Sequence, residues 1–254
     1  MAAPEVLIVV AFFLIALFYS SIGFGGGSSY LALLSLFYAN FEFIRTTALV
    51  CNVAVVLGSV VLFYQKGYFD WRRFLPFVVV SVPAAFFGAQ FQLSQRGFFI
   101  VLGLALIFSA FVLLIKTMLQ RQAAQKKYTS ATTTALGGSV GFLSGMVGIG
   151  GGIFLSPVLN LMRWDEPRKI AALASFFILA NSVSGLGGLF VSGSLHLDLP
   201  LQLALIAAVF AGGQLGVRLT LGLLNPDIVK SLTAVLVLYV GLRLVILHTL
   251  GIHI

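Results

Sequence analysis

The sequence predicts an all-α, polytopic helical membrane protein built as two inverted repeats, each with a glycine-tipped re-entrant helical hairpin and three full spans. Composition gives the class, because 60% of the 254 residues are hydrophobic and only 9% are charged. A soluble domain of this length could not bury so much apolar surface. The apolar runs are continuous rather than alternating, which excludes a transmembrane β-barrel. Two glycine clusters and the placement of the basic residues then predict the repeats.

Ten apolar runs follow one another along the chain. A helix rises 1.5 Å per residue and a bilayer core is about 30 Å thick. Eight runs are therefore near or above the spanning length, whereas residues 28–41 and 153–162 are too short. The ten runs are residues 4–22, 28–41, 46–64, 74–91, 98–118, 132–147, 153–162, 170–191, 199–223 and 228–250. Each short run directly follows a glycine cluster, which predicts that it is one arm of a re-entrant hairpin.

The two glycine clusters lie 125 residues apart and read G-F-G-G-G at residues 23–27 and G-I-G-G-G at residues 148–152. Glycine destabilises a helix interior by about 1 kcal/mol relative to alanine, so both clusters predict a break in the helix. Broken backbone at membrane depth persists only where protein or a polar cavity receives its free N–H and C=O groups. Duplicated breaks of this kind indicate the binding site of a transporter.

A polar linker, residues 119–130, separates an N-terminal repeat, residues 1–118, from a C-terminal repeat, residues 131–254. The halves also match outside the glycine clusters, at an offset of 124 residues. The matches pair Pro76 with Pro200, Gly88 with Gly212 and Gln90 with Gln214. Because they are nearly in register with the glycine clusters, they favour duplication.

The basic residues indicate that the second repeat is inverted. If each hairpin enters and leaves the membrane by one face, one face collects eleven basic residues and the other only Arg45 and Arg96. If each hairpin instead counts as a single crossing, the two faces collect seven and six basic residues. The positive-inside rule favours the uneven split. The eleven are Lys66, Arg72, Arg73, Lys116, Arg121, Lys126, Lys127, Arg163, Arg168, Lys169 and Lys230. We therefore expect both termini to lie outside the cytoplasm and the linker to lie inside it.

Inversion would bring the two glycine tips together near the membrane midplane. A short helix would start after each tip, at about Ser28 and about Ile153, and the unpaired N–H groups of its first turn would attract an anion without any buried Lys or Arg. The candidate binding residues are Gly25, Gly26, Gly27, Ser28, Ser29, Asn52, Gln90, Gly150, Gly151, Gly152, Ile153, Ser175, Asn181 and Gln214. No His, Cys, Asp or Glu constellation in the sequence suggests catalysis, a metal site or a cofactor.

Purely structural interpretations stay open for these residues. The glycines could serve close helix packing, and the Ser, Asn and Gln side chains could bond back to their own or a neighbouring helix. The first cluster is followed by Ser28 and Ser29 but the second by Ile153 and Phe154, so a site between them would be polar mainly on one side.

The motifs resemble a known family. The second half reads G-M-V-G-I-G-G-G-I-F-L-S-P at residues 145–157 and A-A-L-A-S at 171–175, and the first half reads S-S-I-G-F-G-G-G-S-S at 20–29. Together with G-G-Q-L-G-V-R-L at 212–219, they are similar to the signature of the TauE/SafE family of sulfite and organosulfonate exporters. The resemblance covers essentially the whole chain.

The resemblance implies a secondary transporter that exports sulfite, sulfoacetate or a related organosulfonate. A passive anion channel and a permease for another small oxyanion are the alternatives. The expected partners are a small anionic substrate and the lipid bilayer, and a homo-oligomer stays open. The net charge of +8 is read as a topology signal rather than as nucleic-acid binding.

The predicted topology can be tested with reporter fusions placed after Ile254 and within residues 116–130. We expect the linker fusion to report a cytoplasmic position and the C-terminal fusion a periplasmic one, because basic loops are retained inside. A cytoplasmic C-terminus together with a cytoplasmic linker would contradict the inverted repeats.

Overall fold

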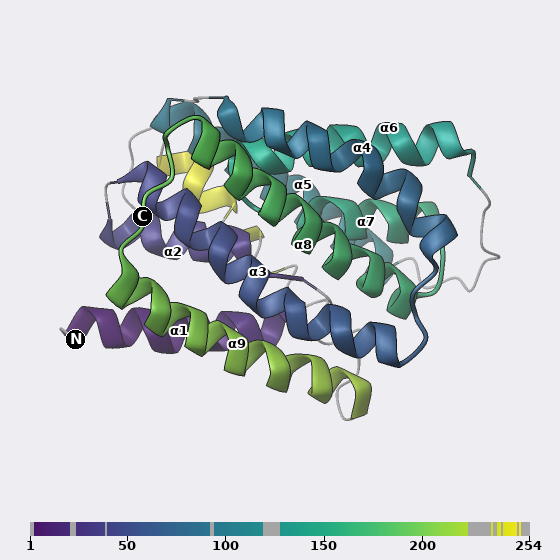
Figure 1. Cartoon of the computed structure of the whole chain (residues 1–254), viewed down its shortest axis with the longest axis horizontal. Helices are drawn as coiled ribbons and strands as arrows, with labels where there is room; N and C mark the ends of the chain where they lie inside the picture. Colours follow the sequence, from purple (N-terminus) through teal and green to yellow (C-terminus); the bar gives the residue numbers. More distant parts are fainter. Residues whose placement is uncertain are drawn as a thin grey trace.

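The computed structural model describes residues 3–20, 24–38, 40–91, 94–118, 128–222, 235, 238–239, 241–247 and 249. Within these ranges the regular elements are helices (Figure 1). They are α1 (Ala3–Ser20), α2 (Gly27–Phe37), α3 (Phe41–Gln65), α4 (Trp71–Gln90), α5 (Gln95–Met118), α6 (Ser130–Val147), α7 (Gly152–Met162), α8 (Pro167–Val191) and α9 (Leu199–Gly222). Most of the linker and most of the last apolar run lie outside the described residues.

The helix lengths repeat in the two halves. Helices α1 and α6 have 18 residues each, α2 and α7 have 11 each, and α3 and α8 have 25 each. The helix starts predicted at about Ser28 and about Ile153 are confirmed within one residue, since α2 begins at Gly27 and α7 at Gly152. Each short helix follows a glycine in the left-handed region, Gly26 with φ 85° and Gly151 with φ 86°.

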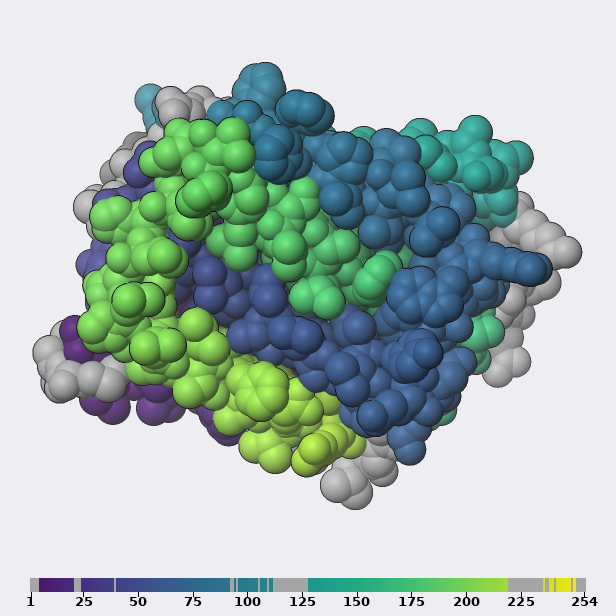
Figure 2. All heavy atoms as spheres, in the orientation of Figure 1, coloured from purple at the N-terminus to yellow at the C-terminus, as the bar shows by residue number. Residues whose placement is uncertain are grey.

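The packing partners also repeat. Helices α3 and α8 pack against each other at the centre, α1 packs on α9 and α6 on α4, while α9 lies on α3 and α4 on α8 (Figure 1). Exchanging α1–α4 for α6–α9 leaves the α3–α8 pair unchanged and converts each of the other four pairs into another pair of the set. Figure 2 shows that side chains of α3, α4, α8 and α9 fill one face of the molecule.

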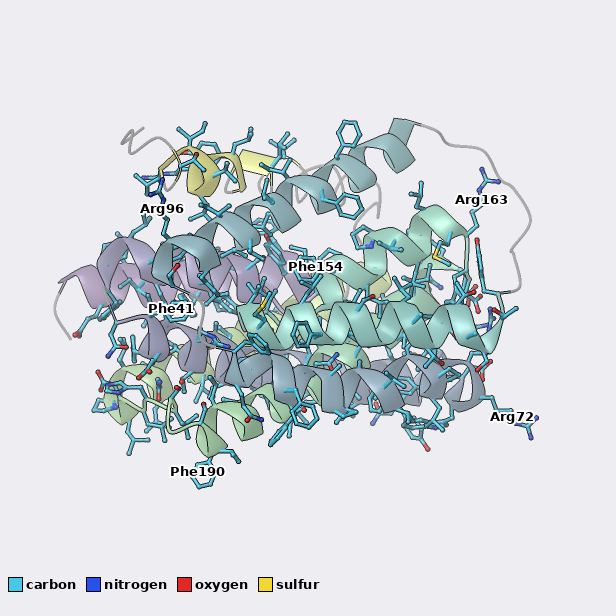
Figure 3. All side chains as sticks on the ribbon, turned by 90° about the horizontal axis from the view of Figure 1, so that it is seen from above. Phe41, Arg72, Arg96, Phe154, Arg163 and Phe190 are labelled. Atoms are coloured by element: carbon cyan, nitrogen blue, oxygen red, sulfur yellow. The ribbon has the colours of Figure 1, made fainter. Side chains whose placement is uncertain are left out.

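One end of the molecule, which we call the linker end, joins the α3–α4 loop to the outer ends of α6 and α7. Tyr128 Oη, just before α6, donates to Met162 O at 2.7 Å, which holds the outer ends of α6 and α7 together. Arg73 forms an ion pair with Asp165, whose side chain is 1% exposed. Arg72 and Arg163 lie at this end in Figure 3. The helices α6 and α7 therefore fold back on each other.

The opposite end, which we call the α1 end, gathers the outer ends of α1 and α2 with the starts of α3, α5 and α9. Burial first, and then the negative charges of Glu5 and Asp198, raise the pKa of the Tyr38 phenol, because each disfavours its ionisation. Figure 3 shows Phe41 and Arg96 at this end and Phe154, near the start of α7, midway along the molecule. The second glycine break therefore lies in the interior between the two ends.

Four helices are long and apolar enough to span a membrane by length and composition: α3, α4, α8 and residues 199–218 of α9. They supply two of the three full spans expected in each half. The third expected span of the first half is α5, in which only the shorter apolar stretch Arg96–Phe108 was found among the described residues. The third expected span of the second half is residues 228–250, most of which the structure does not describe.

Glycine stripes explain how the outer helices approach so closely. A Cβ atom placed on Gly137, Gly141 or Gly145 of α6 would lie 2.3, 2.6 or 2.0 Å from backbone atoms of α4. Likewise, Gly212 and Gly216 of α9 face the backbone of α1, with a Cβ 2.3 or 2.1 Å from a carbonyl oxygen. Such small-residue stripes let membrane helices pack backbone to backbone. These glycines, which lie outside the two clusters, therefore serve close helix packing.

We expect Gly141→Ala to lower the thermal unfolding temperature of the detergent-solubilised protein, because its Cβ would lie 2.6 Å from Ser81 Cα, a backbone atom that cannot turn away. The matched control is Gly187→Ala in α8, whose Cβ would sit 3.7 Å from the Phe86 ring. That control gains helix propensity, about 1 kcal/mol, and no clash. Equal unfolding temperatures for both variants would contradict the close-packed interface.

Candidate functional site

Asn52, near the middle of α3, contacts both glycine turns. Its Nδ2 donates to Ile149 O in the second turn at 2.8 Å. A Cβ atom placed on Gly25 would lie 2.5 Å from Asn52 Oδ1, and one placed on Gly27 would lie 2.4 Å from Nδ2. The side chain is 0% exposed. The structure thus brings the two turns, far apart in the sequence, to one buried amide.

Ile178 occupies the equivalent place in the second half. It is the twelfth of the 25 residues of α8, as Asn52 is the twelfth of the 25 residues of α3. A Cβ atom on Gly25, Gly150 or Gly152 would lie 3.2, 2.8 or 2.3 Å from the Ile178 side chain. The centre is therefore symmetric in position but unequal in chemistry, with an amide on one side and an alkyl group on the other.

Buried polar atoms without a hydrogen-bond partner are concentrated in this region. Within the described part of the chain, nine buried side-chain atoms have no partner. An unsatisfied polar group in an apolar interior costs several kcal/mol, so each such atom requires an explanation, and a polar ligand is one of them. Those in α3, α6 and α8 near the centre are Arg45 Nε, Asn52 Oδ1, Ser144 Oγ, Ser182 Oγ and both amide atoms of Asn181.

Three of these side chains, besides Asn52, lie against the second glycine turn. A Cβ atom on Gly148 would lie 3.6 Å from Arg45 Nε, and one on Gly150 would lie 2.7 Å from Ser182 Oγ. A Cβ atom on Gly151 would lie 3.1 Å from Ser144 Oγ. The unpartnered polar side chains therefore collect around the second turn. They belong to α3, α6 and α8 rather than to the turn itself.

Both short helices add backbone donors. The hydrogen-bond ladder of α2 begins with Ser29 N and Tyr30 N, which donate to Gly26 O at 3.0 Å. Helix α7 begins in the same way, since Phe154 N and Leu155 N donate to Gly151 O at 3.1 and 3.0 Å. Amides ahead of a ladder have no i−4 acceptor in their own helix and give its N-terminus a partial positive charge.

Arg45 corrects an expectation from the sequence. The sequence predicted it in the loop before the apolar run of residues 46–64. Instead it lies in the second turn of α3, is 3% exposed, and donates through Nη2 to Ala89 O at 3.2 Å and to Gly145 O at 3.0 Å. The helix starts earlier than the apolar run because the Asn40 side chain caps it, accepting from Phe43 N. The Asn40 cap was the sequence signal for this earlier start.

Two predicted site residues bond back to their own helix. Gln90 Nε2 donates to Phe86 O at 3.3 Å, and Ser175 Oγ donates to Ala171 O at 2.9 Å. A purely structural role, a bond back to the same helix, therefore fits both side chains.

Ser28, Ser29 and Ile153 directly follow the glycine turns, whereas Gln214 lies elsewhere. Ser28 and Ile153 are buried at the starts of α2 and α7. Ser29 Oγ donates to Tyr19 Oη at 2.7 Å, so this hydroxyl is already engaged. The Gln214 amide lies against Gly58 of α3, where a Cβ atom would be 1.2 Å from its Nε2. It therefore belongs to the α3–α9 contact.

Paired glycine breaks inside a bundle of apolar helices are typical of membrane transporters. The family model described as "Sulfite exporter TauE/SafE" matches residues 8–244. The chain therefore belongs to the TauE/SafE family.

Curated relatives agree with this assignment. The chain is 32% identical over 242 residues to a protein named "Probable membrane transporter protein y4hK" of Sinorhizobium fredii, covering 93% of this chain and 96% of that one. It is 26% identical over 218 residues to "Probable membrane transporter protein YunE" of Bacillus subtilis, covering 78% and 79%. No solved structure matches the chain significantly. The chain is a membrane transporter.

The second turn can be tested by Gly151→Ala against Gly67→Ala. Both glycines have positive φ, 86° and 75°, so both variants carry the strain of a left-handed alanine, about 1–2 kcal/mol. Only at Gly151 would the Cβ meet other atoms, 2.8 Å from Phe177 Cε1; at Gly67 nothing lies within 4 Å. We expect the Gly151 variant to unfold at a clearly lower temperature. Equal shifts would show that the turn is loosely packed.

Proposed function

We propose that this transporter exports small sulfur-containing anions, such as sulfite, sulfoacetate or a related organosulfonate, across the bacterial inner membrane. The anion binds between the two glycine turns, against Asn52. The observation that carries the proposal is the contact of this one buried amide with both turns. Asn52 Nδ2 has two hydrogens and Ile149 O takes one of them, so the other is available to an anion oxygen.

The chemistry around the turns favours an anion over a cation. The Ser144 and Ser182 hydroxyls and Arg45 Nε are donors without an acceptor, and the helix N-termini of α2 and α7 add partial positive charge. Every acidic residue within the described ranges lies instead at a helix start or in a connecting loop. These residues are Glu5, Glu42, Asp70, Asp165, Glu166 and Asp198.

The two halves act as inverted repeats, residues 1–118 and residues 131–254, in this proposal. The equal helix lengths and the exchange of packing partners support the repeat. The inversion is supported by the hairpins, because α1 and α2 have their outer ends at the α1 end, whereas α6 and α7 have theirs at the linker end. Each hairpin then enters the membrane from one face and reaches the centre.

Transport follows from rocking of the two halves about the crossing of α3 and α8. Each end of the molecule has a contact between halves that such a motion would break. At the linker end Arg73 donates to Trp164 O at 2.9 Å and pairs with Asp165. At the α1 end Gln202 Nε2 donates to Thr47 Oγ1 at 2.8 Å. The interior-negative membrane potential is sufficient to drive an anion outward.

The proposal is tested with purified protein by calorimetric binding of sulfite and methanesulfonate, and by efflux of the same anions from proteoliposomes. We expect micromolar to millimolar affinity and preference for methanesulfonate over the neutral methanesulfonamide. Asn52→Leu should weaken binding about tenfold or more, because a hydrogen bond to a charged group contributes about 1.5–3 kcal/mol.

The matched control is Asn160→Leu, another buried asparagine, whose Nδ2 donates to Ser156 O of its own helix at 2.8 Å. This variant should bind as the wild type does. Wild-type protein that binds neither anion, or binds the sulfonamide equally well, would overturn the proposed function. Efflux at channel rates without exchange against external substrate would favour a passive anion channel instead.

A further inference from the structure

Arg45 is a buried cation that forms no ion pair with an acidic residue in the described part of the chain, although Glu42 acts on its charge from a distance. Among the described residues the ion pairs join Arg73 and Lys169 to Asp165 and Glu166, and none of them includes Arg45. Glu42, one turn earlier on α3, is exposed. A buried charge that lacks a partner is costly and is retained in membrane segments mainly where it has a function.

Two helix ends balance part of this charge. Ala89 O and Gly145 O, which accept from Arg45 Nη2, belong to the last turns of α4 and α6. A helix C-terminus has about half a negative charge and favours a nearby cation. This arrangement holds the guanidinium in place, but it uses only Nη2, and a guanidinium has five N–H donors in a fixed fork.

One of the remaining donors, Nε–H, lies beside the second glycine turn. Arg45 Nε is buried without a partner, and it would lie 3.6 Å from a Cβ atom on Gly148, which as glycine has none. Two residues further, Gly150 lies against Ser182 Oγ and Asn52 Nδ2. Cα atoms two residues apart are at most about 7 Å from each other, a span that one sulfonate with a hydrogen bond on either side covers.

We propose that Arg45 supplies the fixed positive charge that selects anions at the second glycine turn. An anion lying along this turn accepts a hydrogen bond from Arg45 Nε–H at Gly148, while Ser182 and Asn52 donate to it at Gly150. Arg45 is then a specificity-determining residue, in addition to its contact with the two helix ends. The inference rests on the proposed function, since it names the residue that makes that site prefer an anion.

The test compares Arg45→Gln and Arg45→Lys with the wild type, using methanesulfonate and methanesulfonamide as probes of equal shape and different charge. Calorimetry gives the two dissociation constants, and thermal unfolding reports whether each variant is folded. In Arg45→Gln we expect methanesulfonate binding to weaken at least tenfold while sulfonamide binding changes less than twofold. Arg45→Lys should keep the preference for the anion but bind it at least threefold more weakly, because the Nε–H donor is lost.

The control is Arg96→Gln, which removes an exposed arginine whose Nη2 donates to Thr249 O at the α1 end. It should leave both dissociation constants unchanged. A folded Arg45→Gln protein with the wild-type preference would assign Arg45 to helix capping alone and overturn the inference. If only Arg45→Lys folds, wild-type affinity for methanesulfonate in that variant would overturn it. A wild type without preference would instead refute the proposed function.

Discussion

The free carbonyl groups left by the second helix break are the constraint on which the centre of this protein depends. In a membrane interior each such group needs a donor from the protein. Helix α3, from the other half of the chain, provides two: Arg45 Nη2 donates to Gly145 O and Asn52 Nδ2 to Ile149 O. The two residues are seven apart and therefore lie on one face of α3. The break is thus stabilised by the opposite half, which couples the halves at their shared centre.

Residues with local causes were predictable from the sequence, and residues with tertiary causes were not. The starts of α2 and α7 follow from Gly26 and Gly151, because a left-handed residue is needed there whatever surrounds it. The face of a helix that a single polar residue occupies depends on packing, which is why Gln90 and Ser175 bond to their own helices. Arg45 was wrongly predicted in a loop because a charged residue is expected outside an apolar helix. The carbonyl groups that accept from it come from α4 and α6, which the local sequence does not indicate.

The centre is symmetric in the positions of its residues but not in their chemistry. Asn52 and Ile178 hold equivalent positions, yet only the amide can bond to backbone or ligand. The serines that follow the first cluster suggested that the first turn would be the polar side. Ser29 is engaged by Tyr19 instead, and unpartnered donors such as Ser144 and Ser182 lie at the second turn. Polarity at such a centre is set by the helices that pack on a turn more than by the turn's own sequence.

The two ends of the molecule are closed by interactions of different strength. At the linker end the Arg73 guanidinium lies 4.5 Å from the Trp164 ring and pairs with the buried carboxylate of Asp165. At the α1 end the contacts of Thr46 with His196 and of Thr47 with Gln202 are neutral hydrogen bonds. Charge-assisted bonds are roughly twice as strong as neutral ones, and a buried carboxylate left unpaired adds a desolvation cost. Separation of the halves is therefore less costly at the α1 end.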